Sequence, residues 1–407
     1  MIMYMKGIHL CTAVWGKTFI KNYTTYTVPS FLAENNIPYL NSKKRIVYTV
    51  YTSTEGEKIL NNSENFKRLS ELCETNINTV IIDNLLNGLN ENKELNKNKQ
   101  NHSQNMKISN FCFSDCIKIA NLRDEGFLLL HPDAIFSKNN LRNLLEYINK
   151  GYRVIYVPGG FRVSINKIHS EIQKFFSNDK CFLSISNSNL VNLSIKNILS
   201  KHKRSLYFNY IKTKFSFEVL LPIKNLGISH RAVVGQDSLF IYPFKKEINY
   251  DVKEVSLECS EFIDSCIYDE KDIILIDDSN VFYKCPIENH NEDYKDFEIF
   301  DIKNSNLPFK KPNSISFALL IEDYNKAKST KNFIFKPIRY NLEEKNIDIT
   351  SWKKFEKKTL FFSKKVFFYY SIFSKSTSLK KFGYLLVLLD QKMTYYLNKI
   401  ILKIKTN

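Results

Sequence analysis

The sequence predicts an α/β protein built on a mainly parallel sheet with helices on both faces. Continuous apolar runs of strand length alternate with amphipathic helical segments through the first 160 residues. Strands that are buried on both faces read as unbroken hydrophobic runs, which is typical of parallel sheets covered by helices. A chain of 407 residues is long enough for one large α/β domain with insertions and a smaller appendage.

The segment 126–160 shows this pattern most clearly. Buried strands are expected at 127–130 and 153–157, with an amphipathic helix over about 139–150 between them. Strand, helix and strand at this spacing predict a parallel βαβ unit. One carboxylate, Asp133, follows the first of these strands. Ligands of open α/β sheets bind at the carboxyl ends of the strands, so we expect the functional site around Asp133.

Three further strands are expected before this unit, at residues 8–14, 45–51 and 78–82. From about Phe215 the chain changes to short strand-like pieces separated by turns. This change predicts a mixed second half, in which antiparallel strands join the sheet.

The composition divides the chain into three regions. Residues 1–290 form the α/β domain, and the polar, low-complexity stretch 87–105 is expected to be a flexible insertion within it. Residues 291–350 form a polar connecting region. Residues 351–407 form a basic, aromatic tail that is expected to be helical.

Charge and cysteine usage narrow the class of protein. The tail carries 13 lysines against only Glu356 and Asp390, a net +11 of the formal +17. A body of near-ordinary charge with a basic end indicates an acidic surface partner and not a protein that coats nucleic acid. The eight cysteines include no Cys-x-x-Cys pair, so no zinc site is expected. With no recognisable leader and no apolar run of about 18 residues, a cytoplasmic protein is expected.

Polar residues follow four of the expected strands. Thr12, Thr52, Asp83 and Asp133 each stand at or just past a strand end. Because the carboxyl ends of parallel strands meet at one edge, these side chains are expected to line one cleft. The other interpretation of Asp133 is that it caps the following helix.

Two further motifs follow expected strands. Gly159 and Gly160 permit a close backbone approach to a ligand or to another part of the chain, or form an ordinary tight turn. Asp277 and Asp278 end an apolar strand and offer paired carboxylates for a general base or a metal, or else form an exposed acidic turn.

Several stretches together resemble bacterial glycosyltransferase-like proteins with a GT-A type, Rossmann-like fold that binds nucleotide sugars. They are HLCTAVWG, RIVYTVYTS, PDAIFSKNNL, GYRVIYV, LFIYPF and ILIDDS, spread over residues 5–285. The resemblance implies transfer of a sugar from a nucleotide-sugar donor to an envelope or surface-glycan acceptor, which includes a lipid-linked one.

The resemblance also implies roles for the candidate residues. Asp133 would hold the donor diphosphate together with Mn or Mg, although the second acidic residue of the usual metal motif is absent. Thr12 and Thr52 would contact the nucleotide and Asp83 its base or ribose. Asp277 or Asp278 would be the general base. The stretch VVGQDS at 233–238 departs from the histidine-containing motif of the family.

Two other classes of function stay open on the sequence. One is a non-catalytic nucleotide- or glycan-binding protein of the same fold that has lost the metal motif. The other is a basic peripheral membrane protein that uses the sheet only as a scaffold. In the tail, aliphatic and aromatic residues beside the lysines favour an anionic membrane surface, at the inner face of the plasma membrane, over nucleic acid. A helical hairpin that covers the sheet is the alternative.

The basic tail is predicted to bind anionic membranes. Its lysines should contribute roughly 1 kcal/mol each near anionic lipid, so the full chain should float with anionic liposomes more than a chain truncated after Thr350. The measurement is flotation at low salt with vesicles of increasing anionic content. Equal flotation of the two chains would make the tail a structural segment.

Overall fold

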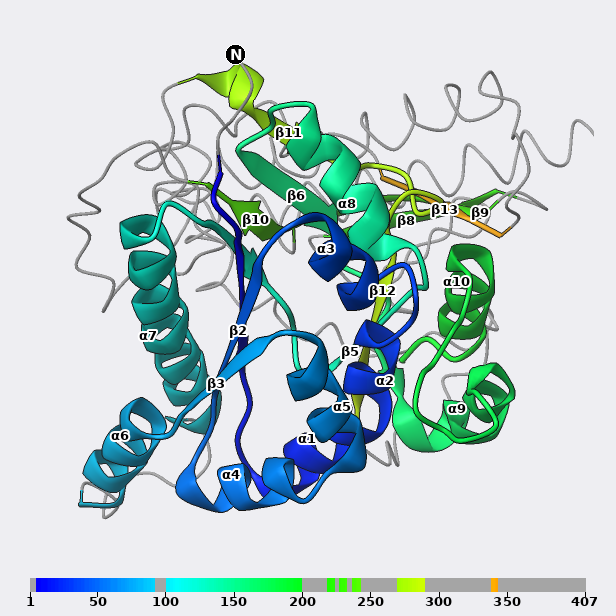
Figure 1. The fold of residues 1–407 in the computed structure, drawn as a ribbon. Helices are drawn as coiled ribbons and strands as arrows, with labels where there is room; N and C mark the ends of the chain where they lie inside the picture. Colours follow the sequence, from blue (N-terminus) through cyan, green and yellow to red (C-terminus); the bar gives the residue numbers. More distant parts are fainter. Residues whose placement is uncertain are drawn as a thin grey trace, which may run out of the picture.

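The computed structural model describes residues 5–91, 100–199, 218–223, 227–232, 236–242, 269–289 and 338–342. At its centre is a seven-stranded sheet with the order β11-β6-β10-β4-β1-β2-β3 (Figure 1). Strand β10 is antiparallel to both of its neighbours, and the other strands run in one direction. The strands are β1 (Ile8–Ala13), β2 (Ile46–Tyr51), β3 (Glu74–Asn78), β4 (Gly126–Leu129), β6 (Val154–Pro158), β10 (Gln236–Ile241) and β11 (Ile273–Leu275).

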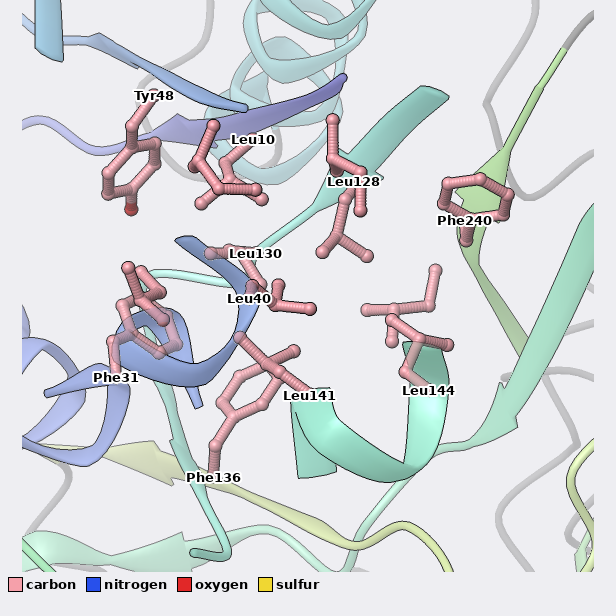
Figure 2. Packing of buried hydrophobic residues seen from close by; sticks show 14 of the residues in the cluster. Leu10, Phe31, Leu40, Tyr48, Leu128, Leu130, Phe136, Leu141, Leu144 and Phe240 are labelled. Carbon is pink, nitrogen blue, oxygen red and sulfur yellow. The ribbon is translucent and has the colours of Figure 1, made fainter. Parts of the chain in front are cut away.

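Helices cover both faces of this sheet (Figure 1). On one face, α6 and α7 pack on Cys11, Tyr51 and Phe127. On the other face, α2 to α5 and α8 pack on Leu10, Tyr48 and other strand residues. The close view in Figure 2 shows this packing for side chains of α2, α3 and α8. The α-helices are α1 (Lys17–Asn22), α2 (Val28–Phe31), α3 (Ile37–Lys43), α4 (Thr54–Asn61), α5 (Glu64–Leu72), α6 (Val80–Glu91), α7 (Gln100–Leu122), α8 (Asn140–Asn149), α9 (Ile165–Ile172) and α10 (Asn187–Lys196). A π-helical stretch (Tyr23–Thr27) joins α1 to α2, and 3-10 turns occupy Gln173–Phe175 and Glu270–Asp272.

Two small sheets accompany the central one. The first has the order β5-β12-β7 and a hydrophobic cluster of its own with α9 and α10. The second, β13-β9-β8, is antiparallel. Their strands are β5 (Ala134–Phe136), β7 (Val163–Ser164), β12 (Lys284–Glu288), β8 (Glu218–Ile223), β9 (Gly227–Ala232) and β13 (Ile338–Asn341).

The prediction of a mainly parallel sheet with a mixed second half is confirmed. Four of the five expected strands, β1, β2, β4 and β6, match their predicted bounds to within one residue at each end. Their residues are buried almost throughout, because helices cover both sides of the sheet. The antiparallel β10 enters from the second half of the chain, as the short strand-like pieces indicate.

The predicted strand at 78–82 is wrong. The third strand is β3, at 74–78, and the apolar run that follows it begins α6. As an edge strand β3 is half-exposed and polar, so it lacks the hydrophobic run of a central strand. Ile82 is buried against α7, with Leu85 and Leu86 packed beside it at helical spacing.

Other predictions fall partly or wholly outside the described residues. The ends of the low-complexity stretch, 87–91 and 100–105, are helical and belong to α6 and α7, whereas 92–99 are not described. The connecting region 291–350 is described only at 338–342, and the tail 351–407 lies outside. Among the helices that are described, none combines the length and apolar character needed to cross a membrane.

A chain of buried hydroxyls joins the central strands. Thr12 on β1 donates a hydrogen bond to the carbonyl of Leu130 at 2.7 Å and lies 2.7 Å from the hydroxyl of Tyr48 on β2. The Tyr48 hydroxyl in turn lies 2.7 Å from that of Tyr23. Thr12, Tyr23 and Tyr48 are all completely buried. Buried polar groups are costly unless they are paired, so these bonds fix how β1, β2 and the end of β4 fit together.

Replacing Thr12 by Val should therefore destabilise the fold while conserving volume. We expect the free energy of unfolding to fall by about 1–3 kcal/mol, because the Leu130 carbonyl and the Tyr48 hydroxyl lose a buried partner. Chemical denaturation measures the loss. Thr12→Ser keeps the hydroxyl and serves as the control. A Thr12→Val variant as stable as Thr12→Ser would contradict this role.

Candidate functional site

The order of strands in the central sheet reverses at β1. From β1 the chain adds β2 and β3 on one side and then returns to add β4 on the other side. In open α/β sheets ligands bind outside the carboxyl ends of the strands at the point where the order reverses. The segments that leave β1 (14–17) and β4 (130–133) flank that point here.

Asp133 stands at this edge and forms an ion pair with Arg162. Its carboxylate accepts a hydrogen bond from a guanidinium N–H of Arg162 at 2.8 Å. The two side chains are 26% and 32% exposed, so a ligand can reach them. Asp133 does not cap a helix, because the chain after it forms β5.

The small sheet β5-β12-β7 holds this pair in place. Asp133 directly precedes β5, Arg162 directly precedes β7, and both of these strands pair with β12. The backbone carbonyl of Asp133 also accepts a hydrogen bond from the Ile287 N–H on β12, at 2.7 Å. Two charged groups separated by 29 residues in sequence are thus fixed on neighbouring backbone segments.

Other ionisable side chains surround the pair, and we call the whole set the Asp133 cluster: His131, Asp133, Arg162, Lys284 and Glu288. Arg162 Nε lies 3.9 Å from the carboxylate of Glu288, and Lys284 is buried. Burial by itself raises the pKa of Asp133, but the charges of Arg162, His131 and Lys284 outweigh it and hold the pKa below its ordinary value. Asp133 is therefore a carboxylate at neutral pH.

Gly159 and Gly160 lie beside the cluster and are packed against the chain itself. A Cβ on Gly160 would lie 1.7 Å from the carbonyl oxygen of Lys284, so the backbones approach too closely for any side chain. The carbonyl of Gly159 accepts a hydrogen bond from the hydroxyl of Tyr340 on β13. This explains the two glycines by contacts within the protein.

The other three residues that were expected to line a cleft with Asp133 are Thr12, Thr52 and Asp83, and they lie in two separate places. Thr12 is buried at the β1–β4 reversal, where its hydroxyl serves the core. Thr52 is also completely buried, under the first turn of α4, and its hydroxyl has no hydrogen-bond partner within the described part of the chain. Asp83 lies in the first turn of α6, not at a strand end, and accepts hydrogen bonds from the backbone N–H and the hydroxyl of Thr54 at the start of α4. Hydrogen bonds thus join Thr12 to the end of β4 and Asp83 to the segment after β2.

Asp277 and Asp278 follow β11 at the same edge of the sheet and are tied to β13. Arg339 reaches both carboxylates, at 3.3 Å and 3.7 Å. Asp278 also accepts hydrogen bonds from the Asn280 N–H at 2.9 Å and the Asn341 side chain at 2.6 Å. These contacts, with the bond from Tyr340 to Gly159, place the acidic pair next to the loop that carries Arg162.

The donor set does not match a dedicated metal site. Within the residues that the structure describes, no group of three or more His, Cys, Asp and Glu side chains is arranged to hold a metal ion. Asp133, which the resemblance makes a metal ligand, is bound to Arg162, and the paired carboxylates of Asp277 and Asp278 are bound to Arg339. The residues present therefore do not make a Mn or Mg site on their own.

The sequence did not single out the cations of this site. Lys284 carries a signal that was available, since a lysine inside the apolar run VFYKCPI is unusual for a buried strand. Arg162 and Arg339 gave no such signal, because their roles depend on contacts with distant segments.

Comparisons with known proteins give little further information. The sequence matches no family model, and no curated protein matches it significantly. Six chains among the solved structures match. One is the crystal structure of mouse xyloside xylosyltransferase 1 in its apo form, with 11% identity, a TM-score of 0.23, and coverage of 41% of this chain and 58% of that chain. The match thus spans little more than half of that protein, and at this TM-score no argument rests on it.

The ion pair predicts a pH-dependent contribution to stability. Because the pKa of Asp133 is lowered in the fold, its contribution is present above the unfolded value near pH 4 and is lost as the pH falls through the folded value. Asp133→Asn should lower the free energy of unfolding by about 1 kcal/mol at pH 7, and this difference from the native chain should shrink below about pH 4. Denaturation across pH 3–7 measures it, with Arg162→Met as the matched partner variant. A difference that does not change with pH would show that the pair contributes nothing in its charged form.

Proposed function

We propose that the protein is a glycosyltransferase that binds a nucleotide sugar at the carboxyl edge of its central sheet. The observation that carries the proposal is the position of Asp133, a partly accessible carboxylate directly after β4, where the strand order reverses. The motifs HLCTAVWG and PDAIFSKNNL, which support the GT-A resemblance, supply the segments on the two sides of this point. An envelope or surface glycan is the proposed acceptor.

Arg162 is the proposed contact for the donor diphosphate. A guanidinium offers planar, paired N–H donors that match phosphate oxygens as well as carboxylates. When the donor binds, Arg162 would exchange its hydrogen bond with Asp133 for one to phosphate, and Asp133 would orient the donor. Asp83 remains the proposed contact for the nucleotide on the β2–β3 side, whereas the two buried threonines would act through the fold, Thr12 by fixing the end of β4 and Thr52 from beneath the first turn of α4. Gly159 and Gly160 would shape the loop that carries Arg162. No step through Mn or Mg is part of this proposal.

The transfer step would break the bond between the sugar carbon and the diphosphate oxygen and form a bond from the acceptor hydroxyl oxygen to that carbon. The nucleoside diphosphate leaves with the bonding electrons, and the hydroxyl proton moves to a carboxylate. Asp277 or Asp278 is the proposed base. Either would have to leave Arg339 in order to accept the proton.

A second candidate is a non-catalytic nucleotide- or glycan-binding protein with the same fold. One observation favours it: Asp133, Asp277 and Asp278 each have an arginine within ion-pair distance. A general base needs a carboxylate oxygen within reach of the acceptor hydroxyl, and in each of these carboxylates an oxygen is held by an arginine. Binding without turnover would distinguish this candidate from the transferase.

The proposed setting is the cytoplasmic face of a membrane. A lipid-linked acceptor would be presented there, and the basic segment 351–407 would bind anionic lipid. That segment lies outside the described residues, so this part of the proposal rests on the sequence.

The site can be tested with a panel of nucleotide sugars, with and without manganese. Calorimetry should detect binding of at least one donor. Arg162→Met should weaken it about tenfold or more because it removes the cation that binds the diphosphate, and Asp133→Asn should weaken it because it removes the carboxylate that orients the donor. Release of nucleoside diphosphate in the presence of acceptor measures turnover.

The control for this test is Asp269→Asn, which removes a carboxylate just before β11, at the opposite edge of the sheet. Circular dichroism confirms that each variant folds. Donor affinity that is unchanged in both Asp133→Asn and Arg162→Met would remove the Asp133 cluster from the site. Binding that depends on the cluster but proceeds without any nucleotide release would favour the non-catalytic protein.

A further inference from the structure

A pocket of about 420 Å³ lies at the edge strand β3, on the face of the sheet that α7 covers. Its lining is mainly polar and includes His9, Thr49, Tyr51, Asn76, Asn78 and Arg123. We call it the β3 pocket. Its volume is in the range of small-molecule sites, and its lining shares no residue with the Asp133 cluster.

The strand register brings the polar side chains of the β3 pocket together. Thr49 on β2 lies opposite Asn76 on β3, and Tyr51 lies opposite Asn78. Alternate residues of a strand point to the same face, so these two cross-strand pairs present their side chains on one side. A hydroxyl, an aromatic ring and two carboxamides therefore form one wall.

A buried relay orients the hydroxyl of Thr49. The ring of His9 is 1% exposed, its Nδ1 lies 3.3 Å from a carboxylate oxygen of Glu125, and its Nε2 lies 2.8 Å from Thr49 Oγ1. Burial lowers the pKa of His9, but Cys116 and then Glu125 raise it above its ordinary value. The carboxylate of Glu125 accepts from Nδ1 and the Thr49 hydroxyl bonds to Nε2, so the ring holds Thr49 Oγ1 in place while that hydroxyl can still form a hydrogen bond to a ligand.

Asn78 supplies the complementary group. Its side-chain oxygen is buried and has no hydrogen-bond partner among the residues described. Buried acceptors are nearly always paired, so a donor from outside the described chain is the expected partner. Because the Asn78 oxygen needs a donor, a simple anion, which offers only acceptors, fits this wall poorly.

The charges near the β3 pocket agree with a neutral ligand. Glu125 faces His9, and Arg45 pairs with Glu74 as well as with Glu125, so two carboxylates lie against these basic side chains. Arg123 is the other cation of the lining, and it is exposed, as is Val80 beside it. Water screens an exposed charge, so the interior of the pocket is dominated by neutral donors and acceptors.

We propose that the β3 pocket binds a small neutral polyhydroxylated molecule of about the size of one sugar unit. Such a ligand carries hydroxyl groups that can bond to the Thr49 hydroxyl and donate to Asn78 at the same time. It can also lie against the ring of Tyr51 and bond to the carboxamide of Asn76. This site is separate from the proposed donor site and does not depend on the transferase activity.

The test is saturation-transfer NMR on the full chain with neutral monosaccharides, D-glucose and D-xylose, and with glucose 6-phosphate as the charged comparison. The native chain should bind at least one neutral sugar. Asn78→Leu and Thr49→Val should each raise the dissociation constant about tenfold, the effect of one lost hydrogen bond. Thr49→Ser keeps the hydroxyl and should bind as the native chain does.

Thr75→Val is the matched control, because Thr75 lies on β3 but points to the opposite face. If Thr49→Val unfolds because His9 loses its hydrogen-bond partner, Asn78→Leu carries the test. No neutral sugar bound by the native chain, affinity unchanged in Asn78→Leu, or binding of glucose 6-phosphate alone would each overturn the proposal. Asp133→Asn should leave sugar binding here unchanged, so failure of the donor site and failure of this one can be told apart.

Discussion

The end of β4 is the point on which the site depends, and Thr12 fixes it. Main-chain pairing between β1 and β4 stops where the Leu130 N–H bonds to the Cys11 carbonyl. The Thr12 hydroxyl then donates a hydrogen bond to the Leu130 carbonyl, while the backbone of β1 continues to pair with β2. This side-chain hydrogen bond takes the place of the next main-chain hydrogen bond between β1 and β4, so β4 leaves the sheet at a defined residue. Asp133 emerges three residues later, at the carboxyl edge of the sheet where the strand order reverses.

The parts of the fold that could be predicted are those in which local sequence and burial agree. Strands β1 and β2 are buried along their whole length, so six consecutive residues in each carry the signal of a covered parallel strand. β3 could not be found in this way, because an edge strand reading ETNIN is half-exposed and shows neither an apolar run nor a clear alternation. The hydrophobic run next to it belongs to α6, and three apolar residues are too few to distinguish a strand from the first turn of a helix.

In the site, too, the features carried by local sequence could be predicted, and those that depend on distant segments could not. The position of Asp133 followed from the sequence, because it is the one carboxylate after an apolar strand in the central βαβ unit. Its partners did not follow, because the Asp133 cluster is assembled by β12, about 150 residues further along the chain. Gly160 is an example of a contact that depends on a distant segment. The sequence indicates a close backbone approach, but only the fold shows that the approaching group is the Lys284 carbonyl and not a ligand.

In the proposed transferase, the ion pairs at this edge would connect donor binding to the transfer step. A guanidinium beside a carboxylate lowers the pKa of that carboxylate, as Arg162 does for Asp133, and so makes it a weak base. Asp133 is therefore suited to orienting a ligand and not to accepting a proton. Asp277 and Asp278 could accept one only after Arg339 has moved to another anion. Phosphate oxygens of a bound donor are such anions. Part of the free energy of donor binding would therefore be used to release the base from Arg339. Without a bound donor, these carboxylates would stay in their ion pairs.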